Sequence, residues 1–448
     1  MNLHPTRHPL TWVPTLYLAM GLPNVMVGVV SAILFKNLGV SNEDIALYTS
    51  QMYLPWVLKP LWAPLLEAYG SQRRWVIGMQ FLMAASLGCV AFCLPLEGFF
   101  RLSLAFFWIT GFASATQDTV ADGLFMATVS PRDQARYAGL QGMCWNLGAV
   151  LASGLLVSLT GWLHERWQLP WVQCWMGVVM LAAAAMVGFA LWHLRMLPPG
   201  APAATLQKPG TAAGFIALRA AWASFFAKPQ IWMMLAVIFF YRFGEGFIEK
   251  FGPLFLLDPR SAGGLGLDNT AMGTINGTVG TLAFIAGAFL GGFLAARRTL
   301  PRSFFVLALV LNVPHLTYWY LSHALPTDPV WIGVVVAAEK FGFGMGSVGH
   351  MLYMMQQVAP GPFRMAHYAM ATGVMAMTRW STGSVSGWVW GWLGHDYAQF
   401  FTWVLVFSVP PVLLAWFAPF PHRGNAADPL PPAHPAAAMT PSTPHATP

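Results

Sequence analysis

Charged side chains interrupt the apolar stretches of this sequence at a few positions, although only 9% of all residues are charged. An ionisable group inside a membrane is costly unless it is paired or hydrated, so each one is a candidate for ligand binding, proton transfer or ion pairing. Acids and bases are equally numerous, which also fits a structural role in which buried pairs hold helices together. The candidates are Lys59, Asp118, Asp122, Arg242, Glu245, Glu249, Lys250, Glu339, Lys340 and Arg379.

Several of these candidates share a depth and a helix face. Arg242 lies about 12 residues, or roughly 18 Å, into an apolar stretch, which places it near the middle of a bilayer. Glu245 and Glu249 follow it at intervals of about one turn, so the three side chains project from one side of a helix. Glu339 and Lys340 lie at a similar depth in another stretch. A vestibule with both charge signs suits a small polar, zwitterionic or anionic ligand, and an acid in it can carry a proton.

The elements that position these residues are membrane-spanning helices. A chain that is 56% hydrophobic with a mean hydropathy of +0.56 is not an ordinary soluble domain, in which about a quarter of the residues are charged. A helix needs roughly 20 apolar residues to cross the bilayer. We therefore predict an all-α integral membrane protein with twelve spans, at residues 10–35, 44–66, 75–95, 101–128, 134–162, 169–193, 230–257, 269–296, 302–323, 329–357, 365–394 and 396–419.

Part of the sequence is repeated. Residues 111–142 and 342–373 align without a gap, and both copies read as an apolar helix, a turn marked by proline and a glycine-rich helix. The coinciding pairs are Gly111/Gly342, Phe112/Phe343, Pro131/Pro362, Ala135/Ala366, Tyr137/Tyr368, Ala138/Ala369 and Gly142/Gly373. Chance similarity between glycine- and alanine-rich helices is the alternative. The shared turn favours a duplication and predicts two pseudo-symmetric six-helix bundles, as in two-domain secondary transporters.

The charged candidates are not repeated, because Asp118, Asp122 and Glu339 correspond to Gly349, Tyr353 and Trp108 in the other copy. Matched architecture with unmatched charge indicates that the two bundles have different roles.

The longest internal polar stretch separates six spans from six. We expect an N-terminal bundle at residues 1–193, a cytoplasmic linker at 194–228, a C-terminal bundle at 229–419 and a disordered cytoplasmic tail at 420–448. In the linker, Phe215, Leu218, Trp222 and Phe225 recur at helical spacing. This pattern fits an amphipathic helix on the membrane surface or an extension of the following span.

The basic residues predict the orientation. Of 23 lysines and arginines, fourteen fall on the predicted loops and ends on the side of the membrane that holds both termini. Four fall on the loops of the opposite side, and the remaining five lie inside predicted spans. Cytoplasmic segments carry such an excess, so both termini are expected in the cytoplasm. The formal charge of +7 then reflects topology and not a nucleic-acid partner. Cys89, Cys93, Cys144 and Cys174 all lie in apolar spans, so we expect no disulfide, metal site or cofactor.

Two predicted inner loops resemble a known signature. Residues 64–74 contain Glu67, Arg73 and Arg74, and residues 291–298 end in Arg297 and Arg298. Both loops resemble the major facilitator superfamily's pattern of a small residue, an acid, a glycine and two basic residues, although the second copy lacks the acid. The basic residues can cap helix C-termini while the acid pairs across the halves, so we expect these loops to latch the inward gate.

Two further segments resemble one family within that superfamily. Residues 115–123 (ATQDTVADG) are similar to the fourth helix, and residues 59–65 (KPLWAPL) to the second helix, of the peptide/acetyl-CoA transporter family. That family includes the AmpG-type muropeptide permeases and the acetyl-CoA transporters. The resemblance implies proton-driven uptake of peptidoglycan fragments or similar N-acetylated compounds across a bacterial inner membrane, with Lys59, Asp118 and Asp122 among the functional residues. The C-terminal half matches only in general pattern.

The superfamily fold implies how the candidates come together. Its first, fourth, seventh and tenth helices line a central cavity, where Arg242, Glu245, Glu339 and Lys340 would converge. We expect an ion pair between Lys59 and Asp118, which lie at similar depths. We also expect proton coupling at Glu339 with Arg242 or Arg379 as counter-ion, and Glu245 as the rival proton carrier.

Other functions remain open at this point. Siderophore or acetyl-CoA-type permeases share the length and topology, and an integral-membrane transferase is a rival of another class. Prenyl transferases need two aspartate-rich motifs, and Asp118 and Asp122 approximate the spacing of only one. We therefore predict a monomeric transporter, not an enzyme, whose partners are a small polar substrate, protons and the lipid bilayer.

Overall fold

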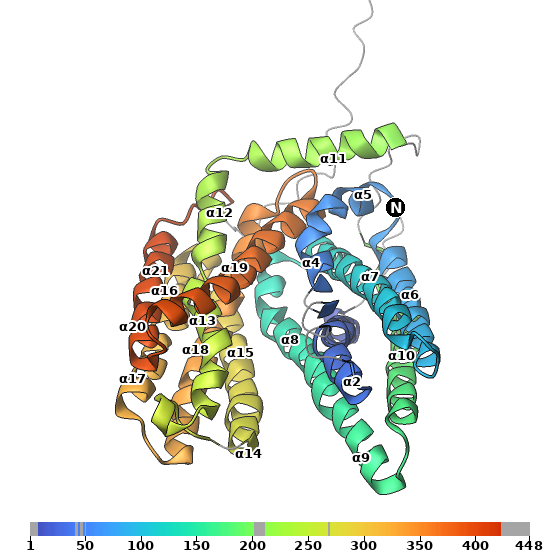
Figure 1. The fold of residues 1–448 in the computed structure, drawn as a ribbon. Helices are drawn as coiled ribbons and strands as arrows, with labels where there is room; N and C mark the ends of the chain where they lie inside the picture. Colours follow the sequence, from blue (N-terminus) through green and yellow to red (C-terminus); the bar gives the residue numbers. More distant parts are fainter. Residues whose placement is uncertain are drawn as a thin grey trace, which may run out of the picture.

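The computed structural model describes residues 8–40, 44, 48–49, 51–200, 211–267 and 269–422. The regular structure of these residues is entirely helical, and ten of the helical segments are long and apolar enough to cross a membrane. They form two bundles (Figure 1). The prediction of an all-α membrane protein built from two helical bundles is confirmed.

The N-terminal bundle begins with a nearly continuous helix and ends before the linker. Ser71 and Ser130 start two of its helices by accepting hydrogen bonds from the backbone N–H groups of Arg74 and Asp133, as N-cap residues do. Its helices are α1 (Val13–Val25), α2 (Ser31–Asn37), α4 (Leu54–Leu58), α5 (Ala63–Ala68), α6 (Gln72–Cys93), α7 (Phe99–Thr128), α8 (Pro131–Val150), α9 (Val157–Trp167) and α10 (Trp171–Met196).

Among the described residues of the C-terminal bundle, three spans are divided. One span is interrupted at Tyr241 and Arg242, a second at Val313–His315, which includes a proline, and a third at Ser408. The helices of this bundle are α12 (Ile231–Phe240), α13 (Phe243–Leu257), α14 (Asn269–Met272), α15 (Gly280–Arg298), α16 (Leu300–Asn312), α17 (Leu316–Ala324), α18 (Pro329–Tyr353), α19 (Arg364–Trp392), α20 (Tyr397–Phe407) and α21 (Val409–Trp416).

Two of the twelve predicted spans are not among the ten apolar helices. The second, at 44–66, lies partly outside the described residues, and its remainder is divided into α4, a 3-10 turn at Lys59–Leu61 and α5. Proline at positions 55, 60 and 64 favours such division because it removes helical hydrogen bonds. The eleventh is the long helix α19, whose serine, threonine and glycine residues and Arg379 make it less apolar.

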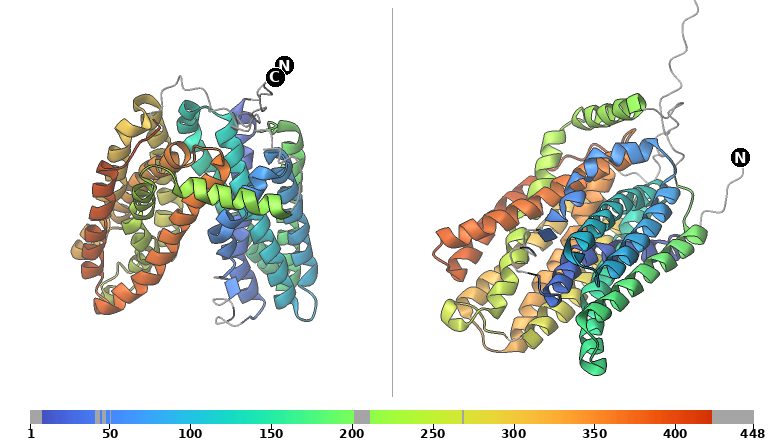
Figure 2. Two further views of the ribbon diagram at one scale, coloured as in Figure 1. Left: turned by 90° about the horizontal axis from the view of Figure 1, so that it is seen from above. Right: turned by 45° about the vertical axis from the view of Figure 1, so that its right-hand side comes forward.

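The linker forms its own helix, α11 (Thr211–Phe226). It is separated from α12 by residues 227–230 and runs across the end of both bundles (Figures 1 and 2). It is therefore not an extension of the following span. Phe225 is buried and Ile216 is exposed, so the helix has a covered and an open side.

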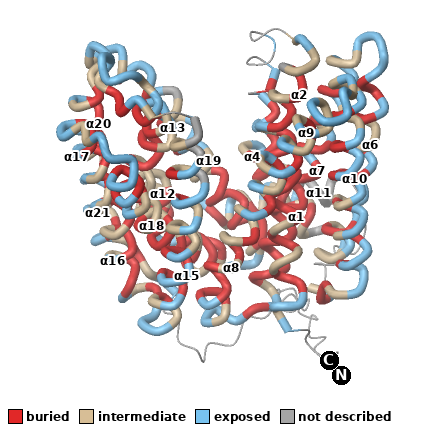
Figure 3. The backbone as a smooth tube through the Cα atoms, turned by 90° about the horizontal axis from the view of Figure 1, so that it is seen from below, coloured by how far each residue is buried: buried red, intermediate tan, exposed pale blue. Residues whose placement is uncertain are grey.

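The two bundles meet at the α11 end and diverge toward the opposite end (Figures 2 and 3). The hydrophobic cores follow this shape. One core contains residues of both bundles, including Trp12 and Phe304, whereas two further cores belong to the N-terminal bundle alone and to the C-terminal bundle alone. The protein is therefore closed at the α11 end.

Glycines make the closed contact possible. Helix α8 packs against α15, and a Cβ at Gly139 would lie 2.9 Å from the backbone nitrogen of Phe289. A Cβ at Gly292 would lie 2.7 Å from the carbonyl oxygen of Ala135. A larger residue at either position would force α8 and α15 apart, because side chains cannot overlap backbone atoms at these distances.

Candidate functional site

The N-terminal bundle holds a buried polar cluster in which two aspartates bind uncharged donors. Tyr17 of α1 donates a hydrogen bond to Asp122 Oδ1 (2.8 Å), and Gln141 of α8 donates to the Tyr17 hydroxyl (2.6 Å). Trp56 of α4 donates from Nε1 to Asp118 Oδ2 (2.9 Å). The two aspartates are one turn apart on α7, so they face α1 and α4 from the same side of the helix.

Lys59 is buried beside these aspartates in the 3-10 turn between α4 and α5. Its charge acts on both Asp118 and Asp122. The expected ion pair with Asp118 is not formed in this structure, because no Lys59 nitrogen lies within 4.0 Å of a described carboxylate. Asp118 Oδ1 is buried without a hydrogen-bond partner among the described residues. The break in the second span turns the helix at Lys59, which sequence depth alone does not reveal.

The C-terminal bundle holds a second cluster around two carboxyl groups. Glu339 of α18 is fully buried and lies 3.1 Å from Lys340 Nζ. Glu245 of α13 is also buried, and its Oε2 lies 3.4 Å from Nε2 of His315. The charge of Glu245 acts on Glu339, and Oε2 of Glu245 and both carboxylate oxygens of Glu339 are buried without a hydrogen-bond partner among the described residues.

The expected counter-ion of Glu339 is wrong, because neither arginine fills that role. Arg379 of α19 forms an ion pair with Glu249 of α13. Arg242 lies with its guanidinium carbon 4.6 Å from the centre of the Phe343 ring. Lys340 is instead the cation on Glu339, since its flexible side chain reaches the carboxylate of the preceding residue.

Glu67 reaches across from the N-terminal bundle at the α11 end. Its carboxylate accepts hydrogen bonds from the backbone N–H groups of Met365 (3.3 Å) and Ala366 (3.1 Å) at the start of α19. Burial raises the pKa of Glu67 to about 7, opposed by these N–H groups and by the charge of Arg364. Burial also lowers the pKa of nearby Lys228 to about 7, opposed by Glu67.

The basic residues of the two loops stay within their own bundles. Arg73 donates to the carbonyl oxygen of Leu194, and Arg74 is exposed. Arg297 lies over the Phe293 ring, 4.2 Å from its centre, and Arg298 is exposed. Among the described gate residues, Glu67 alone forms a hydrogen bond to the other bundle.

Several residues of these clusters were not among the candidates named from the sequence. Tyr17, Trp56 and Gln141 are neutral residues in apolar spans, so hydropathy and charge give no signal for them. His315 had a usable signal, since it is an ionisable residue in the middle of a predicted span and follows a proline.

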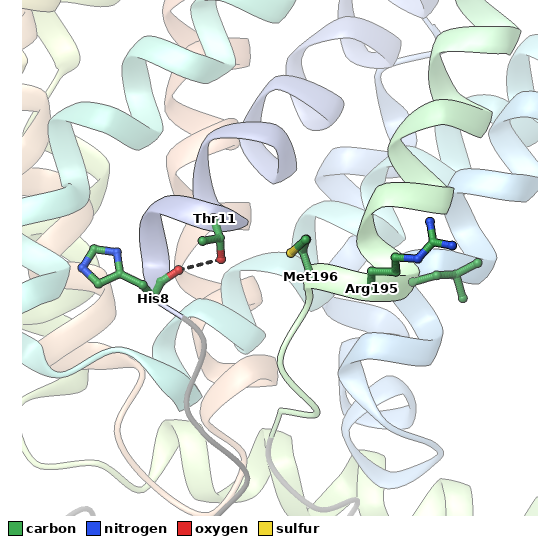
Figure 4. Close-up of a pocket in the computed structure, with 5 residues that line it drawn as sticks. His8, Thr11, Arg195 and Met196 are labelled. Atoms are coloured by element: carbon green, nitrogen blue, oxygen red, sulfur yellow. Dashed lines mark hydrogen bonds between the residues drawn. The ribbon is translucent and has the colours of Figure 1, made fainter.

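Two surface hollows lie away from both clusters. One, of about 600 Å³, is lined by His8, Thr11, Leu194, Arg195 and Met196. In Figure 4 the side chains of His8 and Arg195 point apart, so they do not form a joint binding site. The other, of about 500 Å³, is lined mainly by apolar side chains of α6 and α7. The candidate site is therefore the pair of clusters.

Comparison with known proteins places the chain among transporters. A family model described as Major Facilitator Superfamily matches residues 15–387. The anhydromuropeptide permease of Escherichia coli is 27% identical over 405 residues, which cover 88% of this chain and 77% of that protein. Putative transporter AmpG 4 of Rickettsia conorii is 19% identical over 89% of this chain and 93% of its own. The resemblance to AmpG-type permeases is thereby confirmed.

Solved structures agree with the fold. The fucose:proton symporter FucP of Escherichia coli superposes with a TM-score of 0.68 at 15% identity, covering 91% of this chain and 98% of that one. A structure of FucP in the outward conformation gives 0.66 at 14% identity over the same shares. The family match also removes the transferase alternative, because its members are transporters and not enzymes.

Proposed function

Because the chain belongs to the Major Facilitator Superfamily and is a membrane transporter, we propose that it imports muropeptide-like or other N-acetylated sugar and peptide compounds across a bacterial inner membrane, coupled to protons. The substrate class follows the E. coli anhydromuropeptide permease and the segments at residues 59–65 and 115–123. The protein acts as a monomer, since each chain contains both bundles that the transport cycle needs.

The pair of buried carboxyl groups, Glu245 and Glu339, is the observation that carries proton coupling. Among the described residues, Lys340 is within ion-pair distance of Glu339 only, and Glu245 has only His315 at this distance, which is a cation only when protonated. Two buried carboxyl groups whose charges interact, with one lysine between them, favour a bound proton, since two neighbouring like charges cannot both ionise cheaply in a buried site. A site that holds a proton when buried and releases it when hydrated supplies the alternation that a symport cycle needs.

The shape of the molecule supports import. The positive-inside pattern assigns the α11 end, with Glu67 and the arginine loops, to the cytoplasm. The bundles diverge at the opposite end (Figure 3). With this orientation the structure corresponds to a state that receives substrate from outside and is closed inside.

Uptake measurements test the proposal. Labelled anhydromuropeptide, ferric siderophore or acetyl-CoA is added to the medium outside proteoliposomes that contain the protein. Uptake of each compound is measured with and without an inward proton gradient. We expect gradient-driven accumulation of the anhydromuropeptide. Glu339→Gln, which mimics a permanently protonated group, should retain substrate exchange and lose accumulation, while Glu97→Gln at an exposed acid should behave as wild type.

The outcomes separate the possibilities. If Glu339→Gln still accumulates substrate and Glu245→Gln does not, the proton carrier is Glu245. If both variants accumulate substrate, Asp118 and Asp122 become the candidates. If the gradient has no effect on the wild type, proton coupling is refuted, and if only another compound accumulates, the substrate class is wrong.

A further inference from the structure

The seventh membrane span is broken where Arg242 lies. Helix α12 ends at Phe240 and α13 begins at Phe243, with Arg242 as the residue before the first turn of α13. Within the described part of the chain, no side chain caps this helix start. Discontinuous helices in transporters commonly form substrate sites, because the interrupted backbone and the positive end of the second half-helix face the cavity and favour anionic groups.

Arg242 also has no ion-pair partner among the described residues. Among the described residues no acid lies within 4.0 Å of it, and its Nε atom is buried without a hydrogen-bond acceptor. The other two cations of the cluster are engaged, Lys340 with Glu339 and Arg379 with Glu249. The charges of Glu249 and Glu245 act on Arg242, but neither group is in direct contact with it. A partly buried cation without a direct anionic partner is costly, so Arg242 can accept an anionic group from a ligand.

The surroundings hold Arg242 in place and leave it within reach of the space between the bundles. The Phe343 ring lies under the guanidinium group, at 4.6 Å, which fixes the group by a cation–π contact. Both side chains are partly exposed. The charges of Arg379 and Glu249, which also act on Arg242, act on Tyr53 of the opposite bundle. The cluster therefore lies at the face that the C-terminal bundle turns toward its partner.

We propose that Arg242 binds a free carboxylate of the transported compound, with Phe343 as the residue that positions the guanidinium group. This inference rests on the proposed function and specifies which chemical group of the substrate the C-terminal bundle recognises. The planar guanidinium presents two parallel N–H donors that match a carboxylate, a geometry that an amide or ester cannot satisfy equally. The N-terminal bundle, with Asp118 and Asp122, contributes the opposite sign.

A double-substitution cycle between protein and ligand tests the inference. The ligands are an anhydromuropeptide with free carboxylates and the same compound with its carboxylates converted to primary amides. Their Kd values are measured on purified protein in nanodiscs. For the wild type we expect amidation to weaken binding about 10- to 100-fold, because it removes one charge-assisted pair of hydrogen bonds. Arg242→Gln should weaken binding of the free acid by a similar factor and should not discriminate between the two ligands.

Two further variants separate binding from structural effects. Arg101→Gln removes a positive charge at an exposed position outside both clusters and should discriminate as the wild type does. Arg242→Lys keeps the charge without the planar fork and should retain part of the preference, which also covers the case in which Arg242→Gln does not fold. Equal binding of both ligands by the wild type, or unchanged discrimination in Arg242→Gln or in Arg242→Lys, would overturn the inference and leave the proposed function intact. Binding of neither ligand by the wild type would refute the proposed function and the inference with it.

Discussion

The contact of Glu67 with the start of α19 should make closure of the α11 end depend on pH. In the closed state burial raises the pKa of Glu67 from 4.5 to about 7. When this end opens, the carboxyl group returns to water and its pKa returns toward 4.5. The closed state therefore binds the proton more tightly, and the stabilisation that protonation gives it is fully present below pH 4.5 and is lost as the pH rises through about 7.

The size of the effect follows from these two values. Between pH 5.0 and 6.5 the ratio of closed to open molecules should fall about 20-fold, or about 1.7 kcal/mol. Arg364 remains charged throughout this window. Lys228, with a pKa lowered to about 7, remains mostly charged, and its hydrogen bonds to the Val358 and Pro360 carbonyls keep it with the C-terminal bundle.

Two substitutions isolate the group. Glu67→Gln cannot ionise, so it should hold the closed state at every pH as the wild type does near pH 5. Glu67→Ala leaves the N–H groups of Met365 and Ala366 without their acceptor and should weaken the closed state by ~1–3 kcal/mol. We thus expect Glu67→Gln to remove the pH dependence of closure, and Glu67→Ala to shift the population toward molecules that are open at the α11 end.

Distances between spin labels provide the assay. Labels at Arg132 and Thr299, which are exposed and belong to different bundles at the α11 end, report the closed and open populations in nanodiscs. The native cysteines are replaced first. If the populations of Glu67→Gln still change with pH, or if Glu67→Ala and Glu67→Gln shift them equally, the reasoning is refuted.

Three further substitutions test the rest of the structure. Tyr17→Phe removes the donor to Asp122 and the acceptor of Gln141 and should lower the free energy of unfolding by ~1–3 kcal/mol; an unchanged Tm in nanodiscs would contradict it. Gly139→Leu should keep the spin-label distance long at every pH, because its side chain would meet Phe289, whereas Gly161→Leu, with nothing within 4 Å, should leave the distance unchanged. Trp56→Phe removes the donor to Asp118 and should reduce the initial uptake rate about 10-fold, and wild-type uptake would count against a role for this hydrogen bond.

The fold class was predictable because a membrane acts on each segment separately. A stretch of about 20 apolar residues must form a helix to satisfy its own backbone, so hydropathy marks most spans without knowledge of their neighbours. The duplication at residues 111–142 and 342–373 indicated two bundles for a similar reason, since both copies repeat a local pattern. Charge in an apolar span identified Glu245, Glu339 and Arg242 as candidates by the same rule.

The partners of these residues were decided only by the tertiary structure. Which cation meets Glu339 depends on the rotation and tilt of α18 and α19, and a change of one residue in register turns a side chain by about 100°. Depth along the chain therefore suggested Arg242 or Arg379, whereas the structure pairs Arg379 with Glu249 and leaves Lys340 on Glu339. Local hydropathy finds an ionisable group, but only the packing of helices determines what neutralises it.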